Sequence, residues 1–183
     1  MRKYIVLYKP FLFFLAKFFL TYIILAFVYQ IFLNGFESNQ TDSITKLVAQ
    51  NTEQLLKLFH ADVVLEENKT DDYIKLIYNQ KYVARLIEGC NAISVIILFI
   101  SFVVSFSGKL KPTVLYIIGG SLGIYFLNVM RIALLCVLIY FFPTQESILH
   151  GVFFPLFIYG VVFILWVIWV NKFSLYAKNS TNT

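Results

Sequence analysis

Residues Thr113–Phe142 read TVLYIIGGSLGIYFLNVMRIALLCVLIYFF, an apolar run in which Arg131 is the single charged residue. Such a run is typical of a helix that crosses a membrane. As one helix it would be about 45 Å long, whereas the hydrocarbon core of a bilayer is about 30 Å thick. We therefore expect one helix that either bends at Gly119–Gly123 or rises above the membrane at one end. Two short crossings are the alternative.

Three further apolar runs cover residues 11–33, 90–106 and 151–170. The chain is 60% hydrophobic and has a mean hydropathy of +0.77, which is too apolar for a soluble domain of this size. The run 11–33 is too long for the hydrophobic region of a cleaved signal peptide, so we expect it to remain as the first helix. The sequence thus predicts a single all-α polytopic membrane domain over residues 1–183, with about four transmembrane helices.

The distribution of charge predicts how the chain is oriented. Basic residues precede or begin the first run, form the loop between the second and third, and follow the fourth: Arg2, Lys3, Lys9, Lys17, Lys109, Lys111, Lys172 and Lys178. The segment 34–88 instead holds nine of the ten acidic residues. By the positive-inside rule, both termini face the cytoplasm, while segment 34–88 and the loop 143–147 face outward. The net charge of +5 therefore follows from topology, and we expect no nucleic-acid binding.

The outward-facing segment predicts a small extracytoplasmic insertion that combines a helix and a β-hairpin. Residues 43–59 place apolar side chains on one face of an amphipathic helix, which would lie along the membrane surface or cover the helical core. Residues 73–78 and 82–87 are rich in β-branched and aromatic types, and Asn79–Lys81 separates them, which favours a hairpin. A short amphipathic helix over 73–78 is the alternative. The hairpin would deliver the chain to Cys90 at the outer membrane face.

Three ionisable side chains at membrane boundaries are the candidates for chemistry. Cys90 lies at the outer end of the second run, His150 at the outer start of the fourth, and Arg131 roughly 27 Å into the third. The expected topology therefore brings them to a similar depth near the outer face. A thiolate is a nucleophile, an imidazole can take up and return its proton, and a guanidinium can stabilise an oxyanion. We accordingly select Cys90, Arg131 and His150 as candidate catalytic residues.

Each candidate also has a purely structural interpretation. A cysteine at a helix end is often a packing residue, and a histidine at the interface is often a polar anchor. Arg131 is harder to explain in this way because a mid-span arginine costs about 2.5–3.5 kcal/mol on insertion scales, although it could snorkel or pair with a structural carboxylate. Asn128, one turn earlier, could hydrogen-bond between helices.

The other reactive residue types predict no second centre. Cys90 and Cys136 are too few for a disulfide framework, and Cys136 lies within a span, where we interpret it as a packing residue. His60 and His150 are far apart in the sequence and form no cluster of ligands, so we expect neither a metal nor another cofactor.

The order and context of these residues resemble the exosortase/archaeosortase family of polytopic membrane cysteine transpeptidases. Glu88-Gly89-Cys90-Asn91 resembles the cysteine motif of that family, with Ala92 standing where a glycine is usual. Asn128–Ile132 resembles the arginine motif, and His150 before an apolar helix resembles the histidine. The resemblance covers about residues 73–170. The short chain is similar to the small exosortase F subtype of Bacteroidetes.

This resemblance implies a protein-sorting enzyme in the cell inner membrane. Its substrates would be secreted proteins with a C-terminal signal made of a short motif, a transmembrane helix and a basic cluster. Cys90 would cleave near the motif through a thioester, and the acyl group would pass to an acceptor amine, a lipid or water. Two other classes stay open: a non-catalytic membrane assembly or scaffold protein, and a thiol redox membrane protein that uses Cys90 and Cys136.

Overall fold

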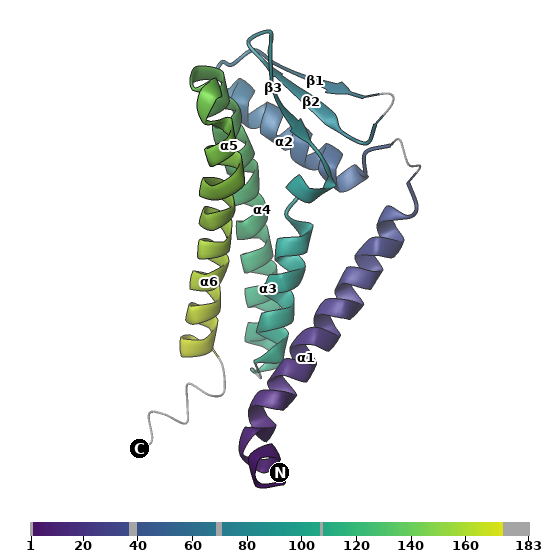
Figure 1. Cartoon of the computed structure of the whole chain (residues 1–183), viewed down its shortest axis with the longest axis vertical. Helices are drawn as coiled ribbons and strands as arrows, with labels where there is room; N and C mark the ends of the chain where they lie inside the picture. Colours follow the sequence, from purple (N-terminus) through teal and green to yellow (C-terminus); the bar gives the residue numbers. More distant parts are fainter. Residues whose placement is uncertain (1, 37–39, 69–70, 107, 174–183) are drawn as a thin grey trace.

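The structure, a computed structural model, describes residues 2–36, 40–68, 71–106 and 108–173 (Figure 1). Its elements are, in chain order, α1 (Arg2–Leu33), α2 (Ser43–Leu58), β1 (Val63–Glu67), β2 (Ile74–Tyr78), β3 (Lys81–Leu86), η1 (Glu88–Cys90), α3 (Ile93–Ser105), α4 (Leu110–Phe141), η2 (Pro143–Gln145), α5 (Glu146–Ile148), η3 (Leu149–Phe153) and α6 (Phe154–Lys172). Figure 1 shows the three strands, α2 and α5 gathered at one end of a helical bundle, opposite the start of α1 and the end of α6.

Three of the described helical segments are long and apolar enough to cross a membrane, namely Tyr8–Leu33, Leu110–Phe141 and Pro143–Lys172. α3 is also apolar, but its 13 residues make it only about 20 Å long. It packs against α1, α4 and α6, so its apolar surface is largely covered by neighbouring helices. The predicted all-α polytopic membrane architecture with a small α/β insertion is confirmed.

The long apolar run around Arg131 forms one helix, α4, rather than two short crossings. Within its glycine-rich stretch, Gly120 lies against the ring of Phe99 from α3, and a methyl group added at Gly120 would overlap that ring. The small residue therefore lets α3 and α4 approach closely, as is common between membrane helices. The C-terminal half of α4 contacts α2, β2 and β3, so the helix extends far enough to carry the insertion.

The insertion contains the predicted hairpin and one further strand. β2 and β3 pair in antiparallel fashion, and Asn79 and Gln80 in the turn have positive φ angles of 47° and 64°, as a type I′ turn requires. The helical alternative for residues 73–78 is wrong. β1, which was not predicted, pairs with β2 to complete a sheet of order β1-β2-β3.

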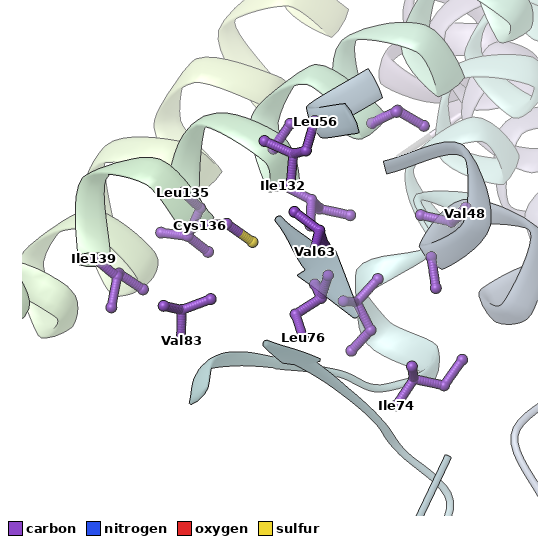
Figure 2. Close-up of a cluster of buried hydrophobic side chains, with 14 of the residues drawn as sticks. Val48, Leu56, Val63, Ile74, Leu76, Val83, Ile132, Leu135, Cys136 and Ile139 are labelled. Carbon is purple, nitrogen blue, oxygen red and sulfur yellow. The ribbon is translucent and has the colours of Figure 1, made fainter. Parts of the chain in front are cut away.

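A hydrophobic core joins the insertion to α4 (Figure 2). Buried side chains from α2, all three strands and the C-terminal half of α4 point into it: Val48, Leu56, Val63, Ile74, Leu76, Val83, Ile132, Leu135 and Ile139. The predicted amphipathic helix therefore covers the helical core, while Leu58 and Phe59 at its end stay exposed. Cys136 is completely buried in the same cluster, which confirms its interpretation as a packing residue.

Candidate active site

The Cys90 turn links the sheet to the membrane helix α3. Residues Glu88–Cys90 form a single 3-10 turn, in which the amide of Cys90 donates to the carbonyl oxygen of Ile87 at 2.9 Å. Ala92 then adopts a left-handed conformation with φ 64°, and α3 begins at Ile93. This sharp change of direction places a partly exposed Cys90 at the junction between the insertion and the bundle.

The left-handed conformation of Ala92 explains why the cysteine motif that the chain resembles usually has a glycine at this position. A side chain in this region costs roughly 1–2 kcal/mol because the Cβ atom approaches the backbone too closely. Glycine avoids that penalty, which accounts physically for a glycine at this position in the motif that the chain resembles. The alanine methyl group is small and buried, so the turn accommodates it.

Two buried asparagines hold the Cys90 turn from opposite sides. The Nδ2 atom of Asn91 donates to the hydroxyl of Tyr29 in α1 at 2.8 Å and to that of Thr45 in α2 at 3.2 Å. The Nδ2 atom of Asn128 in α4 donates to the carbonyl oxygen of Cys90 at 2.7 Å. Asn128 thus forms a hydrogen bond to another segment, but the acceptor is the backbone of the Cys90 turn rather than a second membrane helix. Three helices therefore restrain the position of Cys90.

Arg131 is a half-buried cation that forms no ion pair within the described residues. The ion pairs within the described residues are Lys46–Glu67 and Lys57–Glu53, and neither involves Arg131. Its Nε atom is buried and has no hydrogen-bond partner. Cys90 and Tyr159 lie within electrostatic range of the guanidinium. Within the described ranges, the structure therefore gives no support to Arg131 as half of a structural ion pair, and its Nε–H is unused there.

His150 lies in an irregular turn directly before α6, the last long apolar helix. Residues Leu149–Phe153 form a π-helical turn that leads directly into α6, and the side chain of His150 is exposed. Such π-helical turns are rare and occur frequently at functional sites, because the wider turn changes where the side chains point.

All three candidates line one cavity of about 200 Å³. Cys90 comes from η1, Arg131 from α4 and His150 from η3, so three segments far apart in the sequence meet there. The remaining lining residues come mostly from β3 and α4: Ala84, Arg85, Leu86, Ile87, Ile132, Leu135, Ile139 and Glu146. A thiol, an imidazole and a guanidinium around one space are the groups that covalent acyl transfer requires.

The cavity also contains two charged residues that we did not select from the sequence. Arg85 lies on β3, shortly before the Cys90 turn, and Glu146 lies one helical turn before His150. Glu146 is the one acidic residue outside the segment 34–88, and that isolation was a signal that pointed to it. No group of three or more His, Cys, Asp or Glu side chains in the described ranges is arranged to hold a metal ion.

Comparison with known proteins identifies the family. A family model described as transmembrane exosortase (Exosortase_EpsH) matches residues 5–172, which include the Cys90 turn, Arg131 and His150. No curated protein and no solved structure matched the chain. Since the family model covers nearly the whole chain, from α1 to the end of α6, this protein belongs to the transmembrane exosortase family.

Proposed function

We propose that this protein is a membrane cysteine transpeptidase or peptidase that cleaves the C-terminal sorting signals of secreted proteins at the outer face of the cell inner membrane. The observation that carries the proposal is the convergence of Cys90, Arg131 and His150 on one cavity. Membership of the exosortase family supports a sortase-like role in general. The substrates would carry a short motif, a transmembrane helix and a basic cluster.

The three side chains supply the chemistry of acyl transfer. His150 accepts the proton of the Cys90 thiol as the sulfur attacks the scissile carbonyl carbon, and Arg131 stabilises the resulting oxyanion by hydrogen bonding. When the tetrahedral intermediate collapses, the C–N bond breaks and the leaving amine takes the proton from His150. The product is a thioester on Cys90. An acceptor amine or water then attacks the thioester, and the thiol regains a proton.

The placement of the cavity suits a substrate that is itself anchored in the membrane. The cavity is lined by residues of β3, η1, the C-terminal half of α4, α5 and η3. These elements lie at the end of the bundle that carries the insertion (Figure 1). A substrate helix in the bilayer would hold its motif at this height without any further contact. Binding both partners in one membrane raises their effective concentration.

The thiol redox alternative gains no support from the structure. Cys90 lines the cavity, whereas Cys136 is completely buried in the core between α4 and the sheet, and both are free thiols. A scaffold without catalytic activity is best separated from an enzyme by experiment.

The function is tested most directly in cells that produce the protein. We expect deletion of its gene to leave secreted proteins with their C-terminal helix attached, and re-expression to restore cleavage. Hydroxylamine added to membranes should intercept the thioester and release hydroxamates at the cleaved C-termini, which mass spectrometry detects. An unchanged set of secreted C-termini after deletion would contradict the proposal.

Our proposed topology makes a separate prediction, because both termini should be cytoplasmic and the cavity should face outward. Single cysteines introduced by Glu66→Cys, Lys109→Cys and Gln145→Cys occupy exposed positions. In a background without Cys90 and Cys136, an impermeant thiol reagent added outside should label positions 66 and 145 and spare position 109. Labelling at 109 but not at 145 would place His150 on the wrong side of the membrane and refute the shared site.

A further inference from the structure

Glu146 and His150 lie next to each other on the rim of the cavity. They are separated by one turn of the continuous α5–η3 segment and both line the cavity that holds Cys90 and Arg131. Side chains spaced in this way lie on the same face of a helical segment, within reach of each other. Both are exposed, so neither is held away from the other by packing.

Glu146 differs in charge from the other ionisable residues that line the cavity with His150. The ionisable groups that face the same cavity are Arg85 from β3, Cys90 from η1, Arg131 from α4 and Glu146 from α5. Glu146 is the single carboxylate among these described lining residues.

A histidine that acts as a base also needs its second ring nitrogen to be satisfied. The neutral ring carries its proton on one nitrogen and a lone pair on the other, and the hydrogen bond made by the first decides which nitrogen is free. To accept the proton of Cys90, the free nitrogen must face the sulfur. The opposite N–H points along the exposed rim, where the carboxylate of Glu146 is the one anionic acceptor among the lining side chains.

We propose that Glu146 is a positioning residue for His150, which accepts a hydrogen bond from the ring nitrogen that faces away from Cys90. The bond forms by rotation of these two exposed side chains and requires no movement of the backbone. Its catalytic meaning rests on the proposed function, but the contact itself does not. Glu146 would orient the ring and fix its tautomer without touching the substrate.

The tautomer of His150 tests this directly, because the chain has just two histidines. Histidine labelled with ¹⁵N in the full-length protein in lipid nanodiscs gives two sets of signals, and His60→Gln assigns them. His60 is outside the cavity lining and serves as an internal reference. At a pH where both rings are neutral, Glu146→Ala should change the tautomer ratio of His150 at least about twofold, as expected for loss of one hydrogen bond. The His60 signals should stay the same.

A matched variant and a kinetic measurement complete the test. Ser147→Ala alters the next residue, which lines a neighbouring surface pocket and not the cavity of Cys90, and should leave the His150 signals unchanged. Glu146→Ala should lower the turnover of substrate by about tenfold at unchanged substrate affinity, while Glu146→Gln, which keeps an acceptor oxygen, should retain most of it. An unchanged His150 tautomer in Glu146→Ala, or an equal change in Ser147→Ala, would overturn the inference.

The outcomes also separate this inference from the proposed function. If Glu146→Ala changes the tautomer but Cys90→Ala still processes substrate, the contact exists and the enzyme proposal fails. If Cys90→Ala stops processing while Glu146→Ala changes neither tautomer nor rate, the enzyme proposal stands and Glu146 has no positioning role.

Discussion

Cys90→Ala should reduce the processing of secreted substrates by at least about 10³-fold, because Cys90 supplies the one thiol among the residues that line the cavity. Cys136 cannot substitute, since it is completely buried in the core. The stability of the folded protein should be nearly unchanged. The hydrogen bond from Asn128 goes to the backbone carbonyl oxygen of Cys90, and alanine keeps that acceptor. The variant should therefore accumulate in the membrane at a normal level and be inactive.

Immunoblots of substrate and enzyme from the same cells measure both quantities. Cys136→Ala is the matched control, because it also removes one thiol but from the apolar cluster below the sheet. It should cost about 1 kcal/mol of stability and leave processing intact. Processing by Cys90→Ala at the rate of the unmodified protein would refute the enzyme proposal and favour a scaffold.

The membrane helices could be predicted from the sequence because the bilayer imposes a simple rule. Backbone polar groups in lipid must be satisfied within the segment, so long apolar runs become helices. That rule located α1, α4 and α6. The distribution of charge separated the insertion from the bundle, because nine of ten acidic residues lie in segment 34–88. The local propensities of β2 and β3 and their Asn-Gln turn were sufficient for the hairpin.

Features that depend on contacts between distant segments could not be predicted in this way. β1 exists because it pairs with β2 and buries Val63 in the core shared with α4. Its sequence, VVLEE, is too short and too weakly alternating to indicate a strand alone. The start of α3 could not be predicted either. The second apolar run begins at residue 90, whereas α3 begins at Ile93, because Ala92 adopts a left-handed conformation.

For the candidate site as well, some features could be predicted from the sequence and others could not. Loop charges and apolar run lengths predict the depth of Cys90, Arg131 and His150, so their similar height follows from the sequence. Whether the three side chains also meet around one cavity depends on how η1, α4 and η3 pack against one another. No pattern within the sequence predicts that packing. Arg85 was missed because it looks like an ordinary exposed charge until the cavity is seen. Glu146 stood apart from the other acidic residues, but that isolation did not by itself connect it to the site.

Arg131→Lys should be almost as damaging as removal of the side chain, with a loss of at least about 100-fold, the range observed when one oxyanion donor is removed. The buried, unpartnered Nε atom of Arg131 is one of several directed donors on a planar group. Lysine would keep the positive charge but concentrate it at one flexible point, so the donors would no longer be arranged around an oxyanion.

The same exchange at Arg85 provides the control, because Arg85 lines the same cavity but is exposed on β3. Arg85→Lys should change processing by no more than about threefold, as for most exposed substitutions. Initial rates of substrate cleavage, normalised to the amount of enzyme in the membrane, give both values. If Arg131→Lys cleaves substrate as fast as the unmodified protein, Arg131 contributes charge alone, and the oxyanion must be stabilised by other donors.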